Sequence, residues 1–211
     1  TSCSLITLYM GLDCPAEEVG IDTHTLFVNY QDTNERTYEL AMKEAYDQTD
    51  FVVSNYTDDT AGNHPKGHGV IQIAEVAPGR PWIEIPRAQY QEKKKRTIEV
   101  LLDKLERHYP GVRSHITLRE LATPRTMNLA TRNPDGCVYG FAQTPDQADS
   151  SRFGAQSSFK GLYFAGAWCR GGGGGYMGSL INGRVASRHI LRREGLLEKD
   201  DVEHPLFPAF P

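Results

Sequence analysis

The sequence predicts an α+β fold, in which a mixed, mostly antiparallel sheet is followed by a strand, a glycine turn and a helix. Strand-like and helix-like segments follow one another irregularly along the 211 residues, instead of alternating as in a parallel α/β protein. Near the C-terminus, residues 161–168 have the pattern of a short buried strand, and five consecutive glycines, 171–175, precede a helical pattern that continues to about Arg193.

The elements before the glycine run are predicted from local composition and periodicity. Residues 87–108 are the clearest helix, because Pro86 precedes its first turn and Pro110-Gly111 stops it. Its apolar stripe consists of Ile98, Leu101, Leu102, Leu105 and Tyr109. A shorter helix is expected at 35–47, and strands are expected at 4–10, 24–30, 51–56, 70–77 and 115–122.

Composition excludes several classes of protein. The formal net charge of −4 and the lack of a basic stripe with interleaved aromatic residues argue against a nucleic-acid binder. No apolar stretch approaches the length of a membrane span. We expect a cytoplasmic protein, with membrane association as the alternative. Because Thr1 leads directly into a strand pattern, we also expect the chain to be part of a larger protein.

The cysteines and histidines do not predict a metal site. The cysteines at 3, 14, 137 and 169 form no CxxC pair, and the seven histidines are dispersed. His64 and His68 are four residues apart, but Pro65 and Gly67 between them favour a turn over a helical ligand pair.

The glycine run predicts a cofactor site. Glycines without Cβ atoms allow a ligand to approach the backbone closely, and the following helix offers free N–H groups at its positive end. A flexible hinge is the alternative. The dinucleotide fingerprint GxGxxG, with an acidic residue about 20 positions later, is not found in the chain.

Three segments together resemble the flavin-dependent phytoene desaturase, carotenoid isomerase and retinol saturase superfamily, which is related to the amine oxidases. They read LYMGLD at 8–13, TPRTM at 123–127 with GCVYG at 136–140, and GLYFAG at 161–166 with GGGGGYMGSLINGR at 171–184. Their order is similar to that in the C-terminal half of such enzymes. The resemblance implies a partner segment, on the same parent chain or on a separate subunit, that carries GxGxxG.

The resemblance also implies a division of the chain. Residues 1–122 would be a portion of the substrate domain, and 123–158 a connecting segment near the flavin. Residues 159–194 would be the C-terminal part of the FAD-binding domain, and 195–211 a tail that is unstructured or packed as an extended strap.

By the same resemblance the cofactor is FAD. Gly166 and Ala167 would lie near its ribityl–phosphate arm, although many relatives have an acidic residue where this chain has Ala167. Backbone N–H groups at the start of the last helix would face the N1/C2=O edge of the flavin, and the residues concerned are Gly174, Gly175, Tyr176 and Met177.

The implied activity is desaturation, isomerisation or saturation of a long apolar, polyene-like substrate by hydride exchange with the flavin. Candidate substrate walls are Met127, Leu129, Tyr139, Phe141 and Trp168, with ordinary core packing as the alternative. Arg125 is expected to face a polar substrate end or a phosphate, or else to form a surface ion pair. The catalytic residues are unknown.

Two other functions stay open at this point. One is a non-enzymatic fragment or subunit that completes a flavin site only with the partner segment, and the chain alone is expected to be inactive. The other is an amine-oxidase-like enzyme, in which Trp168 and Tyr176 would flank the flavin.

Overall fold

The computed structural model describes residues 1–57, 62–148, 151–170 and 175–197. The chain forms two compact units. The sheet unit comprises residues 3–137, and the C-terminal unit comprises residues 1–2 together with the chain from residue 138.

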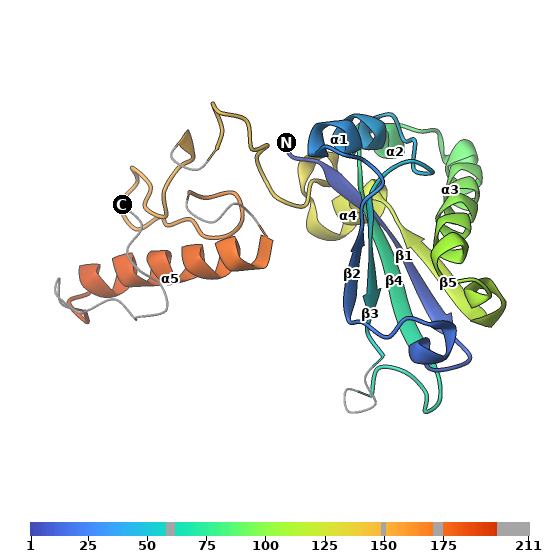
Figure 1. Cartoon of the computed structure of the whole chain (residues 1–211). Coiled ribbons are helices and arrows are strands. Elements are labelled where there is room, and N and C mark those ends of the chain that lie inside the picture. The colour runs from blue at the N-terminus through green and yellow to red at the C-terminus, as the bar shows by residue number, and fades with distance from the viewer. Residues whose placement is uncertain (58–61, 149–150, 171–174, 198–211) are drawn as a thin grey trace. The chain divides into compact units, whose positions relative to one another are not determined.

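The sheet unit is built on a five-stranded antiparallel sheet with the strand order β2-β3-β4-β1-β5 (Figure 1). The strands are β1 (Ser4–Leu12), β2 (Thr25–Val28), β3 (Phe51–Asn55), β4 (Gly69–Ala77) and β5 (Ile116–Ala122). Each lies where the sequence predicts a strand, with ends that differ by up to two residues. The α+β class is therefore confirmed, and the sheet is antiparallel at every pairing.

The helices of the sheet unit are α1 (Asn34–Met42), α2 (Arg80–Ile83), α3 (Arg87–His108) and α4 (Pro124–Thr131). Short 3-10 turns occur at Ala16–Val19 (η1), Val112–His115 (η2) and Pro134–Gly136 (η3). The prediction for α3 is confirmed at both ends. The predicted helix at 35–47 is too long, because the chain leaves the helix after Met42 and Glu44 adopts a positive φ of 59°.

Helix α4 begins with a reciprocal cap. The Thr123 side chain accepts from the backbone N–H of Thr126, and the Thr126 hydroxyl accepts from the backbone N–H of Thr123. Pro124 is in the first turn, where its missing N–H costs nothing. The sequence did not predict this helix.

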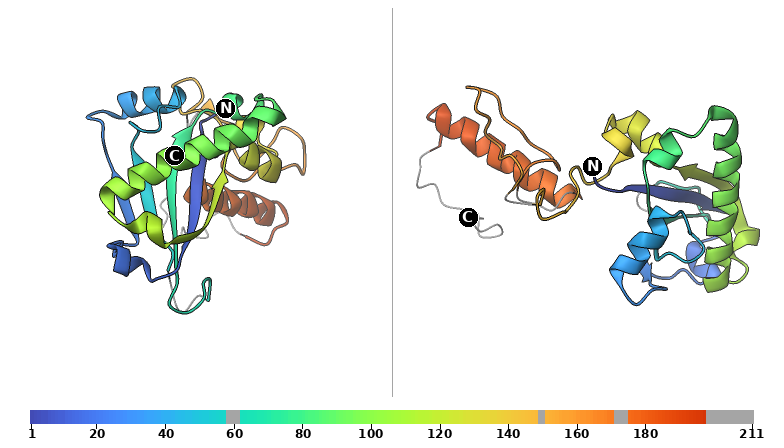
Figure 2. Two further views of the ribbon diagram at one scale, coloured as in Figure 1. Left: turned by 90° about the vertical axis from the view of Figure 1, so that its right-hand side faces the viewer. Right: turned by 90° about the horizontal axis from the view of Figure 1, so that it is seen from above.

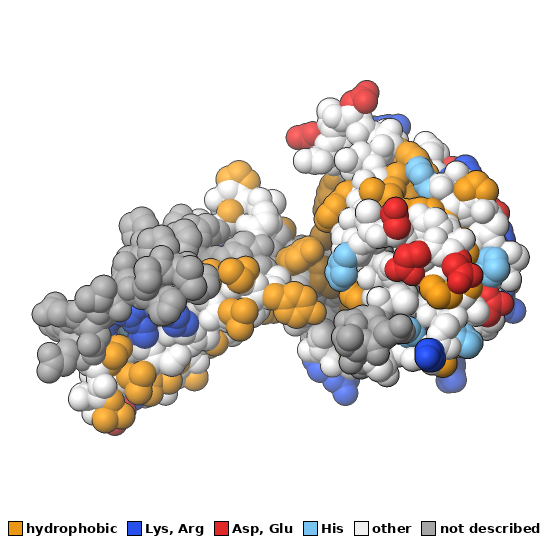
Figure 3. Space-filling view, turned by 60° about the horizontal axis from the view of Figure 1, so that its bottom comes forward, with side chains coloured by type: hydrophobic (Ala, Val, Ile, Leu, Met, Phe, Trp, Pro, Cys, Tyr) orange, Lys and Arg blue, Asp and Glu red, His pale blue; other side chains and the backbone are white. Residues whose placement is uncertain are grey.

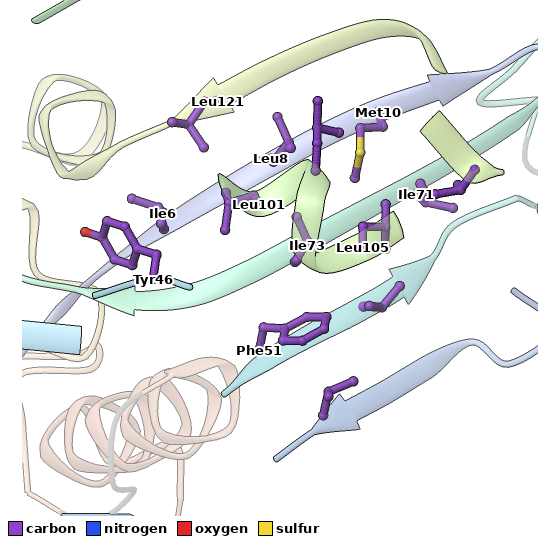
Figure 4. Close-up of a cluster of buried hydrophobic side chains, with 14 of the residues drawn as sticks. Ile6, Leu8, Met10, Tyr46, Phe51, Ile71, Ile73, Leu101, Leu105 and Leu121 are labelled. Carbon is purple, nitrogen blue, oxygen red and sulfur yellow. The ribbon is translucent and has the colours of Figure 1, made fainter. Parts of the chain in front are cut away.

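The core lies between α3 and one face of the sheet, as Figure 2 shows in its left view. Strand β4 alternates strictly between buried and half-buried residues. Ile6 and Leu8 of β1 and Ile73 of β4 point towards Leu101 and Leu105 of α3 (Figure 4). Leu101, Leu102 and Leu105 are buried, while Ile98 and Tyr109 of the predicted stripe are partly buried.

The C-terminal unit contains irregular chain and helix α5 (Gly175–Arg193). The predicted helix is confirmed, and its described part begins at Gly175. Among the residues that the model describes, no helix is both long enough and apolar enough to cross a membrane.

Candidate functional site

The segment 161–168 is not the buried strand that the sequence predicts. Its β-pairing is one isolated bridge between Gln156 and Tyr163, and Leu162 and Phe164 are exposed. A strand is stable only when neighbouring strands satisfy its backbone groups. Within the described part of the C-terminal unit the segment pairs only with the nearby turn around Gln156, so its apolar pattern alone does not make a strand.

The backbone at Gly166 is not crowded by the described part of the chain. Gly166 has a φ of +111°, which L side chains rarely adopt, and a Cβ placed there would meet no atom of the described residues within 4 Å. The segment is held to α5, because the Asn182 side chain donates to the carbonyl oxygen of Gly166 at 3.1 Å and to that of Gly178 at 2.9 Å. Asn182 is 2% exposed.

The N-terminal end of α5 exposes apolar side chains. Tyr176 is 93% exposed, Leu180 69% and Met177 55%. Gly175 has a φ of +70°, and a Cβ there would lie 3.7 Å from the ring of Tyr139. Five of the six predicted cofactor residues therefore belong to the C-terminal unit, namely Gly166, Ala167, Gly175, Tyr176 and Met177. The sixth, Gly174, lies outside the described residues.

Aromatic side chains pack together beside this loop. The ring of Phe141 is 4.8 Å from that of Trp168 at 85°, an edge-to-face contact. Phe153 extends the group, 6.2 Å from Phe141 and 4.9 Å from Phe164. The structure therefore packs Phe141 against Trp168, and we call these four residues the aromatic cluster.

Arg152 ties together the backbone segments that carry the aromatic cluster. Its guanidinium donates to the carbonyl oxygens of Gln147 at 2.9 Å, Phe141 at 2.8 Å and Ala167 at 3.2 Å. It is only 4% exposed. A planar five-donor group suits this task because it can bridge several loop carbonyls at once. Sequence reasoning missed Arg152, which lies in a polar stretch, and also Asn182, whose position in the middle of a helix was a usable signal.

Three other predicted residues lie on α4 of the sheet unit. Met127 is partly buried and Leu129 is 63% exposed, and both lie on α4 of the sheet unit. Arg125 donates to the carbonyl oxygens of Ile83 at 2.7 Å and Ile85 at 2.6 Å. It is therefore a tie between α4 and the chain before α3, and the described contacts are not those of a surface ion pair.

A surface hollow of about 230 Å³ lies between residues 156–163 and Arg193. None of the predicted cofactor or substrate residues lines it. Burial raises the pKa of the Cys169 thiol, so this cysteine beside the loop is a neutral packing group.

The face of the sheet opposite α3 carries exposed apolar side chains together with polar ones, since Gln72 and Glu120 are paired with Tyr9 there. Residues that are paired across antiparallel strands share a face. One such row runs across all five strands through Phe27, Val52, Ala74, Thr7 and Ala122. Tyr9 and Leu118 lie on the same face and are 44% and 69% exposed. We call this surface the open face.

In sequence, the chain is similar to enzymes that are named as oxygenases. The 4,4'-diaponeurosporene oxygenase of Staphylococcus aureus strain MW2 is 26% identical over 191 residues, which cover 86% of this chain. The enzymes of the same name from strains USA300 and Mu50 match equally, with 26% identity. No family model matches the chain.

The chain spans about a third of the length of these curated relatives, since the match covers 36% of each. The similarity therefore concerns one portion of a longer enzyme.

Proposed function

We propose that this chain is the C-terminal portion of an FAD-dependent oxidoreductase that acts on a long apolar polyene. The observation that carries the proposal is the similarity, over 86% of the chain, to an oxygenase whose named substrate, diaponeurosporene, is a carotenoid. The resemblance of the glycine-rich segment to the flavin motif supports the same class.

Two features of the described residues support the flavin proposal. No described atom crowds the backbone at Gly166, and the described part of α5 begins at Gly175, while the N–H groups in the first turn of a helix have no partner within the helix. A helix of 19 residues has a positive N-terminal end, which suits the negative charge that a flavin gains on reduction. When bound, FAD would supply the hydride-accepting or hydride-donating chemistry.

The chain's own residues would position the cofactor and the substrate and would exclude water from the site. Asn182 fixes the Gly166 carbonyl against α5, and Arg152 fixes the backbone of Phe141 and Ala167. The aromatic cluster offers an apolar wall. In the sheet unit, the open face adds exposed apolar side chains, Phe27, Tyr9 and Leu118, although Gln72 and Glu120 lie on the same face. Recognition of a polyene depends on apolar contact area and not on hydrogen bonds.

A second candidate function is a subunit that completes the flavin site of a partner chain and has no activity alone. It is favoured by the exposure of Tyr176, Met177 and Leu180 on α5, because side chains of this kind are usually covered. Apolar side chains gather on the surface of the C-terminal unit in Figure 3.

The test begins with the absorption spectrum of the purified chain after incubation with FAD and desalting. The measurement is repeated in the presence of a second chain, namely the portion of the strain MW2 relative that the match does not cover. We expect flavin bands to be retained with the second chain. Products formed from diaponeurosporene are then identified by mass, which separates desaturation, saturation and oxygen insertion, and by chromatographic retention, which detects isomers of unchanged mass.

Asn182→Leu is the informative variant. Without its amide, Gly166 is no longer held to α5, and we expect flavin retention to fall about tenfold, which corresponds to the loss of one well-placed hydrogen bond. Asn128→Leu, in the sheet unit, is the matched control and should retain flavin. If the chain stays colourless both alone and with the second chain, the flavin proposal is contradicted. If flavin is bound but no product forms, the second candidate is favoured.

A further inference from the structure

Asp13, Cys14 and His115 come together at one end of the sheet unit. One potential ligand atom from each residue lies within 4.8 Å of the other two. Asp13 and Cys14 directly follow β1, and His115 directly precedes β5.

The backbone builds this cluster. β1 and β5 pair with a register shift between Gly11 and Leu12, which is a bulge of the kind that redirects side chains. The Asp13 N–H then donates to the His115 carbonyl oxygen at 3.0 Å. The two chain segments are therefore tied at the point where their side chains meet.

The backbone of Cys14 packs closely against Gly69 of β4. A Cβ at Gly69 would lie 2.9 Å from the carbonyl oxygen of Cys14, so only glycine allows the chain to pack this closely. Cys14 is 7% exposed, whereas the side chains of Asp13 and His115 are 48% and 44% exposed. The cluster thus has a buried sulfur at its base and an entrance lined by the carboxylate and the imidazole.

We propose that Asp13, Cys14 and His115 bind a zinc ion. A thiolate, an imidazole and a carboxylate are the three ligand types that zinc prefers, and three protein ligands with a water in the fourth position form an open tetrahedral site. The Asp13 Oδ1 and His115 Nδ1 atoms are already 2.8 Å apart, so small side-chain rotations bring all three donors around one ion.

The alternative for these residues is an ion pair between Asp13 and His115, with Cys14 as a bystander. Burial and the charges of Asp13 and Glu18 raise the pKa of the Cys14 thiol, so the free thiol is neutral. Metal binding then replaces the thiol proton, which is released to solvent, and the cation neutralises the acidic surroundings. The two interpretations differ in whether the sulfur contacts the metal.

The test uses the full chain after treatment with a chelator. Zinc binding is measured by titration calorimetry, and cobalt(II) is then added as a spectroscopic substitute. We expect one zinc per chain and, with cobalt, the near-ultraviolet charge-transfer band of a cobalt–thiolate bond. Cys14→Ser should abolish the band, and both Cys14→Ser and His115→Gln should weaken zinc binding by at least about tenfold.

Matched controls address the other thiols and imidazoles. Cys3→Ser should keep the cobalt band, and His68→Gln should keep the zinc affinity. Asp13→Asn changes an exposed side chain and keeps the fold, so its loss of affinity is measurable even where Cys14→Ser does not fold. Absence of the cobalt band in the unmodified chain, or zinc binding that depends on His68 and not on His115, overturns the proposal.

Discussion

Lys104 of α3 and Glu75 of β4 form an ion pair inside the core of the sheet unit. Both side chains are 0% exposed, and Lys104 Nζ lies 2.5 Å from Glu75 Oε1 and 2.7 Å from the carbonyl oxygen of Thr49. The Thr49 hydroxyl also donates to Glu75. Each charge is thus compensated by the other, and removal of either one leaves a buried charge without its partner.

The perturbation that we develop is Lys104→Met, which keeps most of the volume and removes the ammonium. Breaking a buried pair from one side typically costs about 3–5 kcal/mol, because the remaining charge has neither water nor a partner. The Thr49 carbonyl also loses its donor, a further loss of about 1 kcal/mol. We therefore expect the free energy of unfolding to fall by about 5 kcal/mol at alkaline pH, where Glu75 is ionised.

The effect should depend on pH in a defined direction. Burial raises the pKa of Glu75 to about 7, although Lys104 and Thr49 act in the opposite direction. Without Lys104 the pKa of Glu75 rises further. A carboxyl whose pKa is higher in the folded state favours folding at low pH, and this contribution is lost as the pH rises through the folded-state pKa. The deficit of Lys104→Met should therefore be smallest near about pH 5 and largest above about pH 8.

The assay is urea unfolding followed by tryptophan fluorescence in a Trp168→Phe background. Trp82 is 0% exposed within the sheet unit, so it reports the unfolding of that unit alone. The double variant Lys104→Met/Glu75→Leu replaces the pair by apolar groups and should lie within about 2 kcal/mol of the unmodified chain.

Two results would refute this reasoning. One is a deficit for Lys104→Met below about 1 kcal/mol, which is the range of exposed ion pairs. The other is a double variant whose deficit equals the sum of the two single ones, because additivity would mean that the charges do not interact.

Two further predictions concern single residues. Gly136→Ala should destabilise the sheet unit by about 2–4 kcal/mol in the same assay, since Gly136 has a φ of +63° and a Cβ would lie 2.2 Å from the Pro124 carbonyl oxygen. Gly67→Ala, with a φ of +77° but no atom of the described residues within 4 Å of the added Cβ, should cost only about 1–2 kcal/mol, and equal losses would exclude the clash as a cause. Arg152→Gln should cost the C-terminal unit about 1–3 kcal/mol by leaving the Phe141 carbonyl without its donor, seen as faster amide hydrogen exchange. Unchanged exchange in the chain around Phe141 would show that Arg152 does not support the loop.

Elements with a strong local pattern were predicted well. Strand β4 alternates at a period of two, and α3 has an apolar stripe with proline before it and Pro110-Gly111 after it. These signals act within a few residues. The end of α1 was predicted less well, because Glu44 leaves the helix for a left-handed turn that the periodicity does not indicate.

The segment 161–168 shows the opposite case. Its apolar residues resemble those of a buried strand, but burial and strand pairing come from neighbouring chain, and here the described pairing is a single bridge. The candidate cofactor loop was found from its glycines, whereas Arg152 and Asn182, which hold that loop, have no motif of their own.

By itself, the sequence determined the α+β class, the positions of the strands and of the long helices, and the glycine-rich segment that resembles a flavin motif. These depend on side-chain periodicity and on backbone freedom, which are local properties. The tertiary structure alone decided which distant residues meet. The pairing of Lys104 with Glu75 and the cluster of Asp13, Cys14 and His115 depend on strand register and helix packing, which the sequence pattern does not specify.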